Sequence, residues 1–233
     1  MNKGRAVAVD LKILSGGAMQ GLMAEAVSLF ERGGGCKVAV EIGLTSALSK
    51  AIAGGAAFDI ALLPRADIDA LACDGWIVPA SVTDIARSAI GVAVRAGTPK
   101  PDISTVEAFK RAVLHAGSIT YSDGPSGLYI GGLMGRLGLA EAIKSKTRLT
   151  TGPVAELLAR GDAELGLQQI VAILPVKGAE LVGPLPDELQ NVIVYAAGVS
   201  TAAQHGAAVR DLMKFLATPE VVRIIRAKGL QPG

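Results

Sequence analysis

The sequence predicts an α/β protein made of two Rossmann-like lobes, and three patterns carry this prediction. Short apolar runs alternate with amphipathic helical segments along most of the 233 residues, which is typical of a mostly parallel sheet covered by helices. Several of these runs end in turns of small residues that open the next helix. Two helices close the chain without adding a strand, so they must pack on an earlier lobe.

The first half predicts three strand–helix pairs. Val7 to Leu14 is an apolar run, and the helix after it places its apolar residues on one face. Residues 38–42 alternate as a half-buried strand does and precede a short helix, and Ile60 to Leu63 precede a helix that follows Pro64. The apolar face of the first helix consists of Leu22, Met23, Ala26, Val27 and Phe30.

The second half repeats this order. We expect strands at Ile90 to Val94, Ile119 to Tyr121, near Lys146 to Leu149, at Leu165 to Gln168 and at Asn191 to Val199. Ser104 to Glu107 has the pattern of a capping box before a helix that buries Phe109, Val113 and Leu114. Pro153 is expected as the first residue of another helix.

The chain ends in helices at Ala207 to Ala217 and Pro219 to Lys228, with Thr218 as N-cap and Gly229 just past the end. If these helices return to the first lobe, that lobe comprises 1–88 and 197–233, and the second lobe 89–196. The chain then crosses between lobes twice, which makes a hinge with a cleft for a small ligand.

Composition excludes two classes of function. Lys and Arg total 23 against 21 for Asp and Glu, and aromatic residues are only 3%, so the chain has neither the basic surface nor the stacking platforms of a nucleic-acid-binding protein. Its apolar runs are too short for a membrane span. We therefore expect a protein that binds no nucleic acid and is not membrane-embedded.

The first residues and the two cysteines concern the cellular location and the presence of a disulfide. Met1 to Arg5 is basic, but Asp10 and Lys12 interrupt the apolar run that follows, so no signal peptide is predicted. The protein is expected in the cytoplasm if the chain is complete, or in the periplasm if a leader was removed. Cys36 and Cys73 match no metal or redox spacing; we expect both to be small buried residues, with a disulfide left open.

Three turns of small residues form the candidate site. They are Ser15-Gly16-Gly17-Ala18, Gly43-Leu44-Thr45-Ser46 and Ser122-Asp123-Gly124-Pro125-Ser126-Gly127, and each opens a predicted helix. The first N–H groups of a helix have no partner within it and carry the positive end of its dipole. Such turns bind anions when they gather around one ligand, whereas singly each is an ordinary cap or turn.

The chain resembles a type II solute-binding protein, in the branch that contains the molybdate-binding proteins of bacterial ABC importers. The resemblance covers essentially the whole chain and implies two lobes, a small anionic ligand and an ABC-transporter permease as partner. It rests on Leu14 to Leu22, Gly43 to Ile52 with Asp59-Ile60, Ser122 to Gly127, Gly161 to Gly166 and the closing Phe215 to Glu220.

The same resemblance implies a ligand set and shows where this chain departs from it. The first ligand serine of the family falls at Ala18, although Ser15 is in the same loop, and the second hydroxyl matches Thr45 or Ser46. The backbone donor before the fifth helix matches Val154. The tyrosine that closes the oxyanion site falls at Gln169, preceded by Gln168. Two glutamines supply both donors and acceptors, which favours a ligand with carboxylate and hydroxyl or carbonyl groups.

The Gln-Gln pair and the Ser-Asp opening of the third turn are more similar to a subgroup of this superfamily that includes aconitate isomerase, although the turn of that subgroup is longer and richer in glycine. Asp123 is then either a turn cap or a residue that accepts a ligand hydroxyl or acts as a general base. Arg65, at a strand end, either pairs with a ligand carboxylate or is simply solvated. The glutamines could instead satisfy local backbone groups.

Together these observations predict a solute-binding protein that closes over a small anion, an organic di- or tricarboxylate or an oxyanion such as molybdate. An isomerase with Asp123 as its acid–base group is the alternative, and a cytoplasmic sensor is a third. The motifs of hydrolases, P-loop proteins and dinucleotide-binding enzymes are absent. We expect a monomer that needs no cofactor and no metal.

Overall fold

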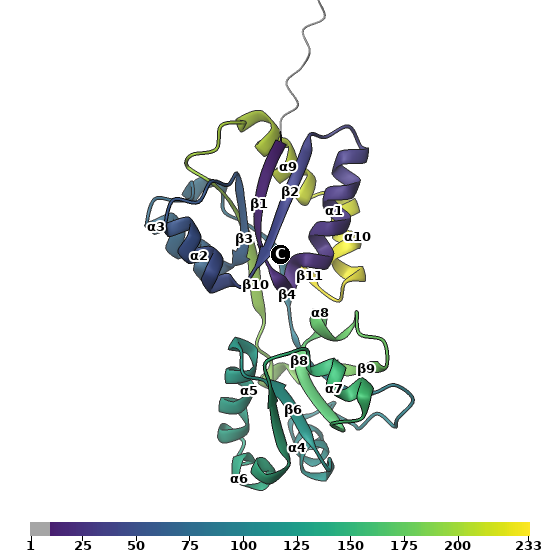
Figure 1. Ribbon diagram of the computed structural model, residues 1–233. Coiled ribbons are helices and arrows are strands. Elements are labelled where there is room, and N and C mark those ends of the chain that lie inside the picture. Colours follow the sequence, from purple (N-terminus) through teal and green to yellow (C-terminus); the bar gives the residue numbers. More distant parts are fainter. Residues whose placement is uncertain (1–9) are drawn as a thin grey trace, which may run out of the picture. The chain divides into compact units, whose positions relative to one another are not determined.

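The computed structural model describes residues 10–233 and divides the chain into two compact units (Figure 1). Unit 1 combines the residues up to Arg87 with Ile193–Gly233, and unit 2 is Ser88–Val192. The chain therefore passes from unit 1 to unit 2 and back. The prediction of an α/β protein with two lobes is confirmed, because each unit contains one sheet with helices packed on it.

Unit 1 has a six-stranded sheet in the order β11-β4-β10-β3-β1-β2. β1 pairs in parallel with β2 and β3, and β10 runs antiparallel to β3. Its elements are β1 (Asp10–Gly16), the 3-10 helix η1 (Gly17–Met19), α1 (Gln20–Arg32), β2 (Lys37–Gly43), α2 (Thr45–Ala53), β3 (Ile60–Pro64), α3 (Arg65–Cys73), η2 (Pro79–Ser81), β4 (Thr83–Ser88), β10 (Ile193–Val199), α9 (Gly206–Leu216), α10 (Pro219–Ala227) and β11 (Gln231–Pro232).

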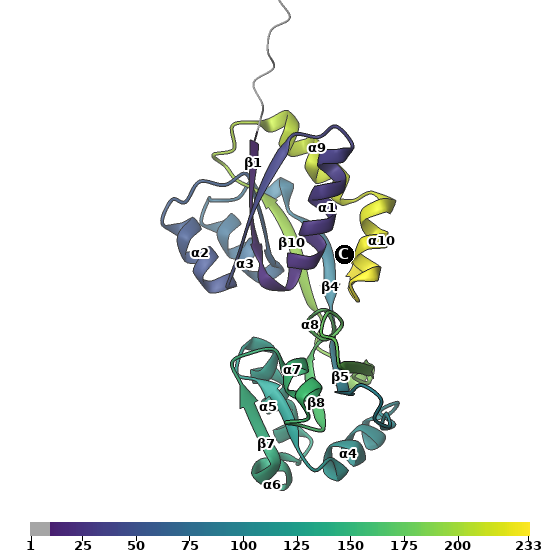
Figure 2. The same cartoon turned by 45° about the vertical axis from the view of Figure 1, so that its right-hand side comes forward.

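Helices cover both faces of this sheet. α2 and α3 pack one core with Leu14 and Ala61 of the strands, and α1, α9 and α10 lie together on the other face (Figures 1 and 2). The rings of Phe30 and Phe215, 5.3 Å apart, join α1 to α9. The closing helices α9 and α10 belong to unit 1.

Unit 2 has a five-stranded sheet in the order β7-β6-β8-β5-β9, with β6 parallel to β7 and β8, and β5 antiparallel to β8 and β9. Its elements are β5 (Ile90–Arg95), α4 (Val106–His115), β6 (Ile119–Ser122), α5 (Pro125–Arg136), α6 (Ala140–Ile143), η3 (Lys144–Lys146), β7 (Thr147–Thr150), α7 (Val154–Arg160), β8 (Leu165–Gln169), α8 (Ile170–Ile173), β9 (Ala179–Pro184) and η4 (Asp187–Leu189).

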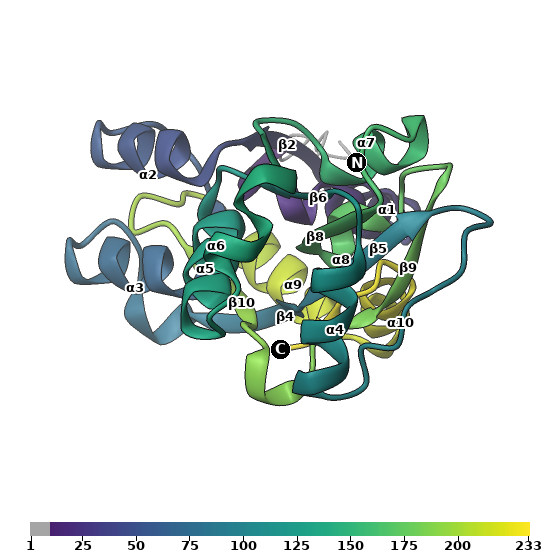
Figure 3. The same cartoon turned by 90° about the horizontal axis from the view of Figure 1, so that it is seen from below.

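The two faces of the second sheet carry different helices. α4, α5 and α6 bury Phe109, Ile130 and Leu133 against one face, and Figure 3 shows α5 and α6 side by side in this layer. α7 and α8 bury Leu158 and Ile173 against the other face. Both faces of this sheet therefore carry helices.

Several local predictions are confirmed. All five residues of the predicted apolar face of α1 are buried. Thr218 is the N-cap of α10, and Gly229 follows its C-cap with a φ of 75°. The first strand was expected from Val7, but residues 7–9 lie outside the described residues, as does the basic segment Met1 to Arg5.

Other local predictions are wrong. Thr105 rather than Ser104 caps α4 and accepts the N–H of Ala108 at 3.1 Å, because the N–H of Ser104 is already bound to Asp102. Leu114 is 45% exposed, since it lies on the outer side of that helix. Pro153 precedes α7 with an extended ψ of 119° instead of beginning it.

The cysteines also differ from expectation. Both are free thiols, Cys73 exposed and Cys36 half-buried. Cys73 ends α3 on a solvent-facing position, and Cys36 lies in the turn before β2. The prediction that both are buried is therefore wrong.

Gln190 holds the two segments by which the chain enters and leaves unit 2. Its side-chain oxygen accepts the N–H of Ile90 at 2.7 Å, and its amide nitrogen donates to the carbonyl of Ile90 at 3.0 Å. The hydroxyl of Tyr129 donates to the neighbouring Leu189 carbonyl at 3.0 Å. One side chain thus fixes the start of β5 to the segment before β10.

Replacing Gln190 with alanine is expected to lower the free energy of unfolding by about 1–3 kcal/mol, because the N–H of buried Ile90 is left without its acceptor. The Ile90 carbonyl still accepts the N–H of Leu185. Urea unfolding measures the loss. Gln204→Ala is the control, since its exposed amide reaches only its neighbour Ala202; equal stability of the two variants would contradict the role given to Gln190.

Candidate functional site

The predicted residues of unit 1 lie at one edge of its sheet. β1 ends at Gly16, which pairs with Gly43 at the end of β2, and Ser15 pairs with Leu62 near the end of β3. Because parallel strands end at the same edge, the turn after each strand projects from that edge. The first turn, the start of α2 and the start of α3 are therefore neighbours.

The first two turns also touch. A β-carbon built on Gly16 would lie 3.5 Å from the hydroxyl oxygen of Thr45. Gly16 is buried, Gly17 is exposed and Ala18 is half-buried. Gly17 and Ala18 begin η1, which continues into α1, so their N–H groups have no acceptor within the helix. Ser15 is fully buried, and its hydroxyl reaches the Gly16 carbonyl at 3.4 Å.

Thr45 and Ser46 are the first two residues of α2, after Leu44 as N-cap. Neither hydroxyl caps the helix, and neither has a hydrogen-bond partner among residues 10–233. Thr45 is half-buried and Ser46 is exposed. The capping alternative for these two residues is therefore not what this structure shows, and both hydroxyls are free to meet a ligand.

Arg65 has protein partners at the same edge. Its guanidinium lies 2.8 Å from a carboxylate oxygen of Asp69 and 2.8 Å from one of Asp84. The hydrogen bonds that Arg65 donates to Asp69, and then to Asp84, raise the pKa of Arg65. The positive charge is thus balanced within unit 1 by two carboxylates, although the side chain stays 45% exposed.

The predicted residues of unit 2 likewise gather at one edge. β6, β7 and β8 are parallel and end at Ser122, Thr150 and Gln169. Asp123 is exposed, and its N–H donates to the Thr150 carbonyl at 3.1 Å. Ser126 and Gly127 are the second and third residues of α5, with Gly124 as N-cap. Ser126 is only 8% exposed, and its hydroxyl has no partner in the described part of the chain.

Gln168 and Gln169 end β8 beside this turn. The side-chain oxygen of Gln168 accepts the N–H of Val154, the first residue of α7, at 3.1 Å. Gln169 is the N-cap of α8 and pairs with Ile90 at the start of β5. The alternative that a glutamine satisfies a local backbone group is therefore what the structure shows for the oxygen of Gln168.

Thr150 was missed by the sequence analysis. Its carbonyl fixes the third turn through Asp123, and its hydroxyl accepts the N–H of Gly152 at 3.0 Å. A threonine at a strand end just before Gly152-Pro153 was the available signal, since such hydroxyls bind nearby backbone groups in turns.

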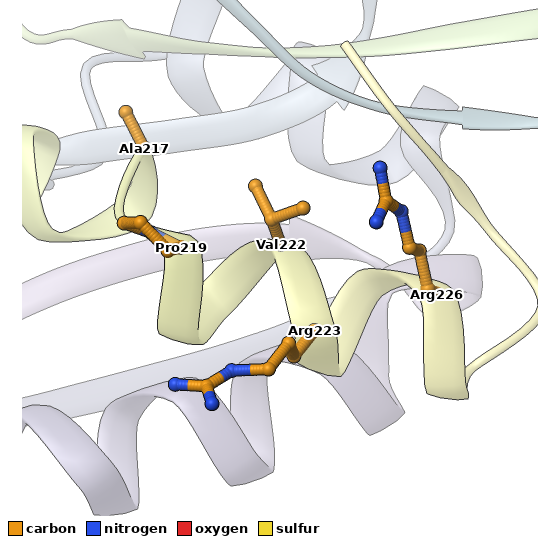
Figure 4. A pocket seen from close by; sticks show the side chains of 5 residues that line it. All are labelled: Ala217, Pro219, Val222, Arg223 and Arg226. Carbon is orange, nitrogen blue, oxygen red and sulfur yellow. The ribbon is translucent and has the colours of Figure 1, made fainter.

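Two surface hollows lie away from these residues. One, of about 490 Å³, is lined by Ala217 and four residues of α10, and Figure 4 shows these side chains on one helix and the turn before it. The other, of about 660 Å³, lies in unit 2 around Lys100–Ser104 and Val182–Glu188. Neither contains a predicted site residue. Within the described residues, no three His, Cys, Asp or Glu side chains gather as a metal site.

The comparison with known families agrees with this arrangement of strands, turns and helices. The sequence matches the family described as bacterial extracellular solute-binding proteins over residues 11–231. The chain belongs to this family. The resemblance drawn from the sequence alone is therefore confirmed for the solute-binding protein as a whole.

The proteins similar to the solute-binding protein include an enzyme and binding proteins. An aconitate isomerase from a Pseudomonas species is 34% identical over 229 residues, which covers 95% of this chain and 87% of that protein. The periplasmic molybdate-binding protein of Azotobacter vinelandii superposes with a TM-score of 0.75 at 19% identity, covering 96% of this chain and 99% of that one. PEB3 with bound L-phospholactate gives a TM-score of 0.71 at 13% identity, covering 96% and 100%. The two structures establish a shared fold.

No helix among residues 10–233 of the solute-binding protein is both long enough and apolar enough to cross a membrane.

Proposed function

We propose that this protein is the solute receptor of an ABC transporter and binds a small organic di- or tricarboxylate with the turns at the carboxyl edges of both sheets. One observation carries the proposal: in each unit, the turns that open helices meet at a single edge of parallel strands. In open α/β sheets, ligands bind at this edge.

The proposed ligand set has two parts. Unit 1 supplies the N–H groups and hydroxyls of Ser15, Gly16, Gly17, Ala18, Thr45 and Ser46. Unit 2 supplies Asp123, Ser126, Gly127, Gln168 and Gln169. Arg65 shapes the edge of unit 1 through its two aspartates, and Val154 acts through Gln168.

A carboxylate is favoured over an oxyanion for two reasons. The relative with 34% identity is named for aconitate, a tricarboxylate. The polar residues at the end of β8 are amides, which offer both donors and acceptors to a ligand with several oxygen groups. We further propose that the protein is a monomer and works outside the cytoplasmic membrane. Its proposed partner is a transporter permease.

A ligand panel tests this function. Thermal unfolding with citrate, aconitate, succinate, molybdate and sulfate should show stabilisation by a carboxylate, of roughly 2.7 kcal/mol when the ligand is at 100 times its dissociation constant. Stabilisation by molybdate alone would indicate that the ligand is an oxyanion rather than a carboxylate. No stabilisation by any of the five would contradict the proposal.

Isomerisation of aconitate is the second candidate, favoured by the same relative. Asp123, exposed at the turn before α5, is then the base that takes a proton from the methylene carbon beside the double bond. The double bond shifts, and a proton returns to the far carbon of the allylic system. NMR of trans-aconitate with the pure protein detects this turnover. If the spectra stayed unchanged over hours while aconitate still bound, isomerisation would be excluded and the receptor function would remain.

A further inference from the structure

The orientation of the Gln168 side chain is determined by its neighbours. β8 lies between β6 and β5, and its side chains alternate between two faces. A β-carbon built on Gly166 would lie 2.7 Å from Val154, so this face of the strand meets α7. Gln168, two residues later, is on the same face, and its side chain meets the first N–H of that helix at 3.1 Å.

This contact decides which end of the amide faces Val154. A backbone N–H can only donate, so the amide oxygen must be the atom that meets it. The NH₂ group is then the end left over. It has no hydrogen-bond partner among the described residues, and the side chain is half-buried. Rotating the amide would place two donors against each other.

We propose that Gln168 is a specificity-determining residue whose NH₂ group donates to the ligand, so that the ligand must offer an acceptor, a carboxylate oxygen, at this point of unit 2. The proposal rests on the function proposed above. It assigns the N–H of Val154 to positioning, because that N–H is consumed by Gln168. Arg65, the one cation among the predicted site residues, is paired with Asp69 and Asp84, so neutral donors of this kind carry the recognition of the anion.

Gln168→Glu tests the chemistry of the donor. One carboxylate oxygen still accepts the N–H of Val154, while the other replaces the NH₂ group with a charged acceptor. Aconitate is the probe, measured by calorimetry. We expect the wild-type protein to bind aconitate. At pH 8 we expect the variant to bind aconitate at least about 30-fold more weakly than the wild type. The difference should narrow toward pH 5, because a protonated glutamic acid can donate again.

Val154→Pro tests the positioning without touching the donor. Proline is accepted at the first position of a helix and lacks the N–H that holds the Gln168 oxygen. The amide is then free to rotate, and we expect aconitate binding about 3–10-fold weaker. This variant also serves if Gln168→Glu does not fold.

The outcomes separate this proposal from the function it rests on. Wild-type protein that binds none of the five panel ligands would overturn both. Aconitate binding by the wild type with unchanged affinity in Gln168→Glu and Val154→Pro would overturn the role of Gln168 alone. Loss in Gln168→Glu that does not recover toward pH 5 would also overturn it, because a donor would then not be the group required.

Discussion

Replacing Gly127 with alanine is expected to abolish ligand binding, with affinity reduced at least about 100-fold, and to lower stability by about 1–3 kcal/mol. A β-carbon at this position would overlap the carbonyl group of Ser122, where β6 ends. The obstacle is backbone rather than a flexible side chain, so the turn from Ser122 to Gly124 must move. That movement displaces the first N–H groups of α5 and the Ser126 hydroxyl.

Gly132→Ala is the matched control for this prediction, because it changes the same residue type in the same helix. A β-carbon there meets only the end of the Arg136 side chain at an ordinary 3.7 Å. Alanine has the higher helix propensity, so stability should rise by about 0.5–1 kcal/mol with binding unchanged. Calorimetry and urea unfolding measure both properties. Full ligand affinity in Gly127→Ala would show that the third turn is not part of the site.

Thr45→Val and Ser126→Ala are each expected to weaken binding about 10-fold or more, since each removes one hydroxyl that donates to a charged ligand. Neither hydroxyl has a partner among residues 10–233, so removing it leaves no protein group unpaired. Valine also keeps the shape of threonine at the start of α2. Stability without ligand should therefore stay close to that of the wild type.

Thr83→Val is the control for these hydroxyl variants. Thr83 begins β4, is exposed and donates only to the Ser81 carbonyl at 3.2 Å. Its loss should leave affinity unchanged, as measured by calorimetric titration of the ligand selected by the panel. If Thr45→Val weakened binding and Ser126→Ala did not, unit 2 would contribute less than proposed.

Much of the fold was predictable because it follows from local sequence patterns. The apolar stripe of α1 follows from spacing alone, and Thr218, Pro219 and Gly229 mark the ends of α10. The strands β4, β9 and β11 were missed, and the expectation that the closing helices add no strand is wrong, because β11 follows α10 and joins the sheet of unit 1. β4 carries Thr83, Asp84, Arg87 and Ser88 among few apolar residues, so its pattern did not differ from that of a loop. It is a strand because of its neighbours β10 and β11 in the sheet.

For the candidate site, the sequence predicted the positions of the turns but not the contacts of individual side chains. Small residues after apolar runs locate the edges of the sheets, because such turns must follow parallel strands. The partners of individual side chains depend on distant residues. Arg65 is paired with Asp84, and Gln168 with the N–H of Val154. No local pattern encodes these pairings, which arise only when strands and helices from separate segments are packed together.

Amide NMR during a titration of aconitate into the isotopically labelled protein tests the central claim most directly. The account predicts that the N–H resonances of Gly17, Ser46 and Gly127 all move and saturate at the same ligand concentration, because all three belong to the proposed ligand-binding residues. Shifts confined to residues of one unit, or no shifts at these three positions, would contradict it.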